Sequence, residues 1–113
     1  MIKGIGIDIV EIERIRQIKN RDHFVDRILA PVEQELYNTF NSEDRKIEFL
    51  AGRFAAKEAY SKAIGTGIGS LSFKDIAFIN NKEGKPYCIN QAYTVHVSIS
   101  HSEHYAVANV ILE

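Results

Sequence analysis

One long helix is the feature of this sequence that most constrains its fold. Residues 47–65, IEFLAGRFAAKEAYSKAIG, contain strong helix formers and no proline, and the pattern stops at a glycine. At about 100° per residue, two apolar stripes run along opposite sides of this helix. The first stripe holds Ile47, Leu50, Ala51 and Phe54, and the second holds Phe49, Ala56, Tyr60 and Ala63. We expect a helix with two apolar sides to be buried between two layers.

Glu58 interrupts the first apolar stripe, and Lys62 follows it one turn later. A buried carboxylate needs a cation, because burial of an unpaired charge is costly. The simplest interpretation is an i,i+4 ion pair with Lys62 on an exposed strip. The glycine-rich residues 65–69 favour a site instead, since glycines let backbone N–H groups approach a ligand such as phosphate. The cations that this helix could place around Glu58 are Arg45, Arg53, Lys57 and Lys62.

The first ten residues, MIKGIGIDIV, predict an opening strand. Its isoleucines point to one face, whereas Gly4, Gly6 and Asp8 point to the other. Strand interiors disfavour both glycine and aspartate, so this face needs a reason. Two glycines beside Asp8 make a floor that another group can approach closely. The alternative for Asp8 is an ordinary strand-end or surface carboxylate.

The remaining segments predict helices first and strands afterwards. Helices are expected at residues 11–19 and 31–40, and Ser42 is a good N-cap for the long central helix. Strands are expected at residues 73–79, 87–90, 95–100 and 105–112, with turns at 80–86 and 101–104. This order predicts an α+β fold, in which an antiparallel β-sheet packs against the central helix within a single domain, residues 1–113.

Composition excludes several classes of protein. The chain is 45% hydrophobic and 26% charged with a net charge of −1, so its whole surface gives no reason to expect nucleic-acid binding. The single Cys88 excludes an internal disulfide and a cysteine-rich zinc site. We see no apolar run of transmembrane length and no signal-peptide pattern, so we expect no membrane association and a cytoplasmic location.

Residues 14–27 are locally basic, with apolar residues among the arginines. Such a run is most often a solvated face, but the mixture is also typical of a docking surface for an acidic protein partner. His101 and His104 lie in an expected turn, where histidines are more often surface groups than ligands. A Ser–His hydrolase is rejected, since no nucleophile-elbow pattern accompanies the nearby serines.

Two motifs together resemble the 4′-phosphopantetheinyl transferases: GIGIDIVEI at residues 4–12 and FAAKEAYSKA at residues 54–63. The loop GTGIG at residues 65–69 and the segment HVSISH at residues 96–101 are similar to the small subclass of this family, the holo-[acyl-carrier-protein] synthases. The resemblance covers nearly the whole chain, and residues 80–94 are its loosest part.

The resemblance implies an activity and a metal. Such enzymes move the phosphopantetheine arm of coenzyme A onto a serine of apo acyl carrier protein, release adenosine 3′,5′-bisphosphate and support fatty acid biosynthesis. By this resemblance Asp8 and Glu58 hold a Mg²⁺ that also touches the pyrophosphate. Lys62 would neutralise phosphate charge or protonate the leaving group. Asp8, Glu58 or a metal-bound water could each serve as the general base.

The resemblance also implies two sets of binding residues and an assembly. The expected coenzyme A contacts are Arg45, Arg53, Lys62, Gly65, Thr66, Gly67 and His101. The expected docking face for the carrier protein consists of Arg14, Ile18, Arg21, Phe24 and Arg27. The small members of the family are homotrimers with active sites at subunit interfaces, which suits a helix that is apolar on two sides.

Two other classes of function remain open. A different metal-dependent phosphohydrolase would use the same carboxylates but would need no basic docking face. A non-catalytic trimeric binding module would need neither the metal nor the lysine.

Overall fold

The computed structural model of the protein describes residues 1–65, 72–89 and 92–113. The helices are α1 (Ile12–Arg16), α2 (Arg21–Ile28), α3 (Pro31–Thr39) and α4 (Glu43–Ile64), with a short 3-10 turn, η1, at Phe73–Asp75. The strands are β1 (Gly4–Glu11), β2 (Ala77–Asn80), β3 (Pro86–Ile89), β4 (Val95–His101) and β5 (Tyr105–Leu112).

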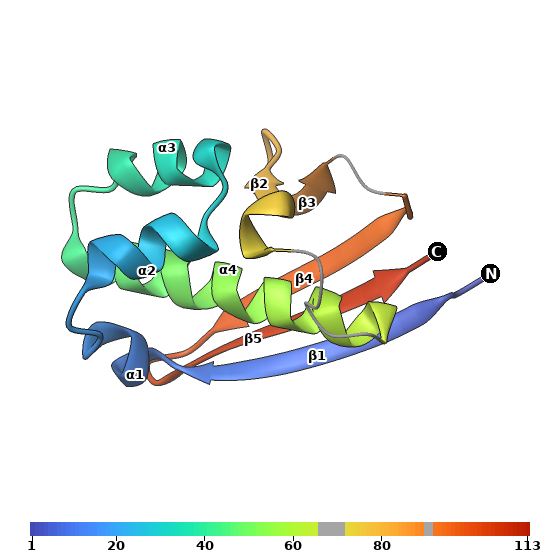
Figure 1. Ribbon diagram of the computed structural model, residues 1–113, viewed down its shortest axis with the longest axis horizontal. Coiled ribbons are helices and arrows are strands. Elements are labelled where there is room, and N and C mark those ends of the chain that lie inside the picture. Colours follow the sequence, from blue (N-terminus) through green and yellow to red (C-terminus); the bar gives the residue numbers. More distant parts are fainter. Residues whose placement is uncertain (66–71, 90–91) are drawn as a thin grey trace.

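The helix α4 lies between two layers, as Figure 1 shows. One layer is an antiparallel sheet with the strand order β1-β5-β4. The other layer contains α2, α3 and the antiparallel hairpin of β2 and β3. The predicted α+β fold, with an antiparallel sheet against a long helix, is therefore confirmed.

The central helix begins and ends where the sequence predicts. The Ser42 side chain accepts a hydrogen bond from the backbone N–H of Arg45 at 3.3 Å, and Gly65 ends the helix with a left-handed φ of 84°. Leu50 from one apolar stripe and Ala56 from the other are both fully buried. The chain's own sheet and helices thus cover most of both stripes, and Phe49 and Phe54 stay only partly buried.

The glycine face of β1 packs directly on the backbone of α4. A Cβ atom added at Gly6 would overlap the carbonyl oxygen of Ala59, and one added at Gly4 would overlap that of Ala63. Only glycine allows the strand and the helix to come this close. The predicted close approach is confirmed, but the approaching group is the helix and not a ligand. This packing places Asp8, the next residue on the same face, beside α4.

The helix α2 was not predicted. Asn20 caps it by accepting a hydrogen bond from the backbone N–H of His23 at 3.1 Å. Its buried residues Phe24, Val25 and Ile28 follow helical spacing, so the sequence did contain a helix signal among the arginines of this segment. Because Asn20 begins a new helix, α1 ends at Arg16 instead of continuing to residue 19 as predicted.

The strand predicted at residues 73–79 is only partly correct. Residues 73–75 form η1, where the Asp75 carboxylate accepts a hydrogen bond from the backbone N–H of Ser72 at 3.0 Å. This capping contact bends the chain before β2 begins at Ala77. The other three predicted strands are confirmed within one or two residues.

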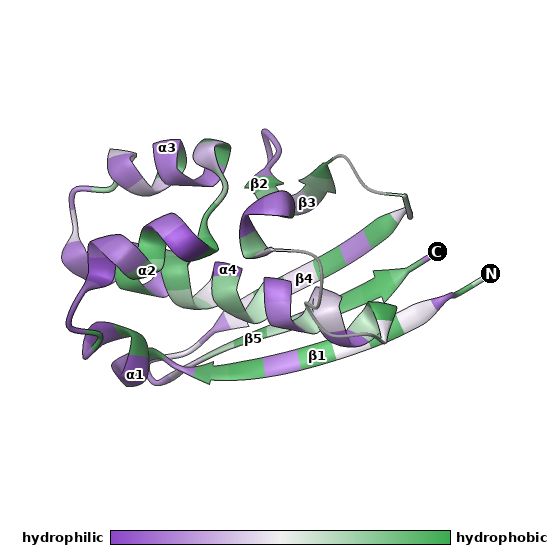
Figure 2. Ribbon diagram, in the orientation of Figure 1, coloured by the Kyte–Doolittle hydropathy of each residue, from purple (hydrophilic) through white to green (hydrophobic). Residues whose placement is uncertain are grey.

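The outer face of β1 is apolar and exposed at one edge of the three-stranded sheet. Hydrophobic residues follow β1 and β5 in Figure 2, and Ile5, Ile7 and Ile9 are 60–65% exposed. Asn109 of β5 pairs in register with Ile7, and its Oδ1 is buried without a hydrogen-bond partner among the described residues. A contiguous apolar face of this kind marks an interaction surface. None of the described helices has the length and apolar character needed to cross a membrane.

Candidate active site

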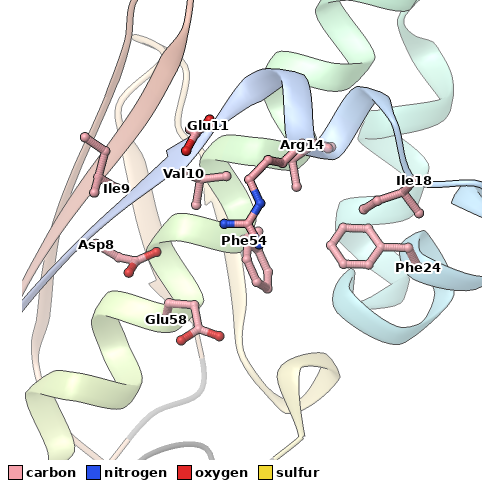
Figure 3. A pocket seen from close by; sticks show the side chains of 10 residues that line it. Asp8, Ile9, Val10, Glu11, Arg14, Ile18, Phe24, Phe54 and Glu58 are labelled. Carbon is pink, nitrogen blue, oxygen red and sulfur yellow. The ribbon is translucent and has the colours of Figure 1, made fainter.

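Asp8 and Glu58 line one hollow of about 400 Å³ beside β1, shown in Figure 3. Asp8 comes from the face of β1 that packs on α4, and Glu58 comes from α4 itself. The structure thereby brings together two carboxylates that lie fifty residues apart in the sequence. The other residues that line the hollow are Ile9, Val10, Glu11, Arg14, Ile15, Ile18, Phe24 and Phe54.

The pKa of Glu58 responds to its surroundings in this hollow. Partial burial raises the pKa of Glu58, the Asp8 carboxylate raises it further, and Lys62 acts in the opposite direction. Lys62 Nζ lies 3.1 Å from Asp8 Oδ1 and 3.0 Å from the carbonyl oxygen of Ile7. Among the described contacts, the lysine is thus paired with Asp8 across the strand and not with Glu58 one turn earlier. Glu58 keeps a like-charged neighbour that a further cation would offset.

This donor set fits Mg²⁺. Two carboxylates from different elements face one hollow, and burial together with the nearby Asp8 charge raises the pKa of Glu58. Mg²⁺ prefers oxygen ligands and is usually held by one or two carboxylates together with waters and substrate phosphates. The Asp8 side chain is only 17% exposed, so it is held in place for such a role.

Three of the four cations expected around Glu58 lie elsewhere, and Arg45 is one of them because it lines a separate hollow beside β4. Lys57 is fully buried and forms an ion pair with Glu33 of α3, and Arg53 donates to the carbonyl oxygen of Phe78 at 3.0 Å. The expectation was wrong because neighbouring residues on a helix leave its axis about 100° apart. Lys57 directly precedes Glu58, so its side chain points about 100° away from that of Glu58 and into the core.

Most of the predicted docking face surrounds the same hollow. Arg14, Ile18 and Phe24 line it, and the Arg27 guanidinium lies 5.8 Å from the centre of the Phe24 ring. Figure 3 shows Arg14 reaching over this hollow. Arg21 does not line it. Its hydrogen bond to Glu43 of α4 raises the pKa of Arg21.

A second hollow, of about 230 Å³, lies beside β4. It holds three of the predicted coenzyme A contacts, Arg45, Arg53 and His101. The guanidinium of Arg45 lies 4.8 Å from the centre of the Phe40 ring, and that of Arg53 lies 4.4 Å from the centre of the Phe49 ring. Cations that are stacked on aromatic rings in this way are held ready for an anion.

The two hollows lie at opposite edges of the sheet. The first uses β1 and the second uses β4, and these are the outer strands of the order β1-β5-β4. No described residue lines both. One copy of the chain therefore does not bring the carboxylate pair together with Arg45 and Arg53. Gly65 is exposed at the end of α4, and Thr66 and Gly67 lie outside the described residues.

Sequence reasoning missed Phe54 in the first hollow and Phe40 and Phe49 in the second. Phe54 was assigned to the core, yet it lines the first hollow and stacks on Phe24 with ring centres 5.6 Å apart. Its place one turn before Glu58 on the same helix face was the available signal. Phe49 had the same signal, since it lies one turn from both Arg45 and Arg53 on α4, whereas only the fold brings Phe40 to this hollow.

The raised pKa of Glu58 has a consequence for stability. A carboxyl group whose folded pKa exceeds its unfolded pKa contributes stability when protonated, and this contribution is lost as pH rises through the folded pKa. Without metal at neutral pH, Glu58→Gln should therefore unfold at a slightly higher temperature than the wild type. Mg²⁺ should stabilise the wild type but not the variant. Thermal unfolding with and without Mg²⁺ tests this, and a variant that melts lower without metal would contradict it.

Comparisons with known proteins identify the family of this chain. The model of the 4′-phosphopantetheinyl transferase superfamily matches residues 4–110. Holo-[acyl-carrier-protein] synthases from Staphylococcus saprophyticus and Staphylococcus aureus are 56% and 53% identical over 115 residues, covering 100% of this chain and 99% and 97% of theirs. The crystal structure of a holo-(acyl-carrier-protein) synthase from Bacillus anthracis in complex with CoA (3′,5′-ADP) matches with a TM-score of 0.91 and 52% identity, covering 100% of this chain and 97% of that one. This chain belongs to the 4′-phosphopantetheinyl transferase superfamily.

Proposed function

We propose that this protein transfers the 4′-phosphopantetheine group of coenzyme A to a serine of apo acyl carrier protein and releases adenosine 3′,5′-bisphosphate. The observation that carries the proposal is the Asp8–Glu58 pair in a hollow flanked by Arg14 and an apolar wall. The names of the relatives and the coenzyme A bound to the Bacillus anthracis structure support it. The protein would act as a single domain over residues 1–113, in the cytoplasm, in support of fatty acid biosynthesis.

The carboxylate pair, Lys62 and the cations of the second hollow each have a role in this proposal. Asp8 and Glu58 would hold Mg²⁺, which supplies positive charge to the pyrophosphate when it is bound. Lys62 is held against Asp8 but is still 56% exposed, so its ammonium group can reach a phosphate or the leaving group. Arg45, Arg53 and His101 would bind the phosphates of coenzyme A, and residues 65–67 would contribute backbone N–H groups.

We assign the carrier protein to the surface around the first hollow. Arg14 and Arg27 supply positive charge there, and Ile18 and Phe24 supply apolar contact. An acidic partner would be attracted by the arginines and anchored by the apolar residues. Its target serine would then lie close to the carboxylate pair.

Arg14→Glu should raise the KM for the carrier protein about tenfold or more, because charge reversal opposes the approach of an acidic partner. The KM for coenzyme A should hardly change. Lys82→Glu, an equal charge reversal at an exposed position outside both hollows, is the matched control. Steady-state kinetics at several salt concentrations tests this. An unchanged KM for the carrier protein would contradict the assignment of the docking face to this surface.

We also propose that the enzyme is a homotrimer with its active sites between copies. The carboxylate pair lies at one edge of the sheet, and Arg45 and Arg53 lie at the opposite edge. A neighbouring copy is therefore needed to bring them together. The exposed isoleucines of β1 offer an apolar surface for this contact. On the same face, Asn109 Oδ1 has no hydrogen-bond donor among the described residues, and a neighbouring copy would supply one.

Release of adenosine 3′,5′-bisphosphate tests the proposed function. With coenzyme A and Mg²⁺ present, release should require apo acyl carrier protein and should stop when its target serine is replaced by alanine. A phosphohydrolase would release product without the carrier protein. A binding module would release none.

A further inference from the structure

The ammonium group of Lys57 is buried at a junction of three elements. The residue is 0% exposed although it adjoins Glu58 in the sequence. Its Nζ forms an ion pair with Glu33 of α3 and donates to the carbonyl oxygens of Ile28, at 2.6 Å, and Phe73, at 3.0 Å. Burial lowers the pKa of Lys57, and Glu33 opposes this effect. The proposed reaction makes no use of this group.

Glu33 connects Lys57 to the hairpin of β2 and β3. It is also 0% exposed. Its Oε1 accepts from Lys57 and from the backbone N–H of Ala30 at 2.8 Å, and its Oε2 accepts from the backbone N–H of Phe78 in β2 at 2.8 Å. Both carboxylate oxygens are therefore occupied, and a backbone group of β2 depends on one of them.

Phe78 of β2, whose N–H binds Glu33, also forms a hydrogen bond with Arg53. The Phe78 carbonyl oxygen accepts from Arg53 Nε at 3.0 Å, and Asn80 Oδ1 accepts from Arg53 Nη2 at 3.2 Å. The guanidinium also stacks on Phe49 and lines the second hollow. A continuous chain of contacts thus runs from Lys57 through Glu33 and Phe78 to Arg53.

The charges of Lys57, Glu33 and Arg53 do not cancel. Lys57 and Arg53 are cations and Glu33 is the one anion that the described contacts place between them, so the group carries a net positive charge. Burial lowers the pKa of Arg53 to about 10, Glu33 opposes this, and the side chain stays protonated at neutral pH. The Glu48 carboxylate also lines the second hollow, where it lies 3.9 Å from His101 Nδ1, and an anion bound beside Arg53 would offset the positive charge of that buried guanidinium.

We propose that Glu33 and Lys57 are positioning residues, which hold Arg53 through the Phe78 peptide in the orientation that binds a phosphate of the adenosine 3′,5′-bisphosphate portion of coenzyme A. This inference rests on the proposed function for the identity of the ligand. Lys57 fixes the Glu33 carboxylate, Glu33 fixes β2 through the Phe78 N–H, and β2 fixes Arg53. Neither Glu33 nor Lys57 touches the ligand itself.

Isothermal titration calorimetry with adenosine 3′,5′-bisphosphate tests the inference. Glu33→Gln keeps the size of the side chain but places an amide N–H₂ against N–H donors, so β2 should shift. We expect about tenfold weaker binding of the bisphosphate, the loss typical of one charge-assisted hydrogen bond. The KM for coenzyme A should rise in step, whereas the KM for the carrier protein should not. Val110→Ala, a fully buried truncation in β5, is the control for destabilisation and should bind the bisphosphate as the wild type does.

The outcomes separate this inference from the proposed function. Wild-type protein that does not bind the bisphosphate would contradict the proposed function. Normal binding by both the wild type and Glu33→Gln, or equal losses in Glu33→Gln and Val110→Ala, would overturn the positioning role alone. If Glu33→Gln does not fold, hydrogen exchange of the wild type decides the matter. Saturating bisphosphate should then slow exchange of the Phe78 amide more than that of Val97 in β4, and an equal or absent effect would overturn the inference.

Discussion

Glu58→Gln and Asp8→Asn should each lower kcat for carrier-protein modification by about a hundredfold or more and leave the fold intact. Each change keeps the shape of the side chain but removes one of the two negative charges that would hold Mg²⁺ beside the pyrophosphate. The Asp8 change should also weaken the 3.1 Å contact with Lys62, because an amide oxygen accepts the hydrogen bond but carries no charge. Steady-state kinetics with circular dichroism as the check on folding measures both effects.

Glu35→Gln is the matched control for this prediction. Glu35 is an exposed carboxylate of α3 outside both hollows, so its replacement should leave kcat unchanged. A chelator should reduce the wild type to the level of the two variants, and added Mg²⁺ should restore only the wild type. Full activity in either Asp8→Asn or Glu58→Gln would refute the assignment of the pair.

Lys57→Met should lower the free energy of unfolding by about 3–5 kcal/mol, because it leaves the Glu33 charge buried without its partner. For a domain of this size, such a loss corresponds to a fall of roughly 10–20 °C in the melting temperature. The two carbonyl oxygens that accept from Lys57 Nζ would also lose their donor. Thermal and denaturant unfolding measure the effect.

Lys62→Met provides the contrast on the same helix. Lys62 is 56% exposed and its ion pair with Asp8 lies near solvent, so the melting temperature should hardly change while turnover falls. The two lysines, five residues apart, should therefore separate stability from activity. A Lys57→Met variant as stable as Lys62→Met would show that the buried pair contributes no net stability.

The sequence predicted the parts of the fold that depend on local pattern. The central helix has a serine cap, a glycine end and two apolar stripes, and the structure confirms all of them. The strands with alternating side chains were also predicted correctly. The helix α2 was missed because its arginines concealed the spacing of Phe24, Val25 and Ile28.

The site could be predicted only in part. Asp8 and Glu58 stood out because each was a carboxylate in an environment that disfavours one, and the structure places them in one hollow. The partner of each cation was not predictable, because pairing depends on which elements meet in space. Lys57 meets Glu33, Lys62 meets Asp8 and Arg21 meets Glu43, and none of these pairs is close in sequence.

The division of the site between two edges of one sheet could not be predicted either. Strand order decides it, and β5 inserts between β1 and β4 although it is the last strand in the chain. The exposed isoleucine face of β1 follows from the same arrangement, since the glycine face is used for packing on α4.

The most direct test of this account is activity from mixed copies of two inactive variants. Glu58→Gln disables the hollow beside β1, and the double variant Arg45→Ala, His101→Ala disables the hollow beside β4. If sites form between copies, unfolding and refolding the two together in equal amounts should restore about a quarter of the sites, those that join the two intact halves. Recovery of wild-type kcat in roughly that fraction is the predicted result. Mixed assemblies that form but show no activity above the two parents would contradict a site shared between copies.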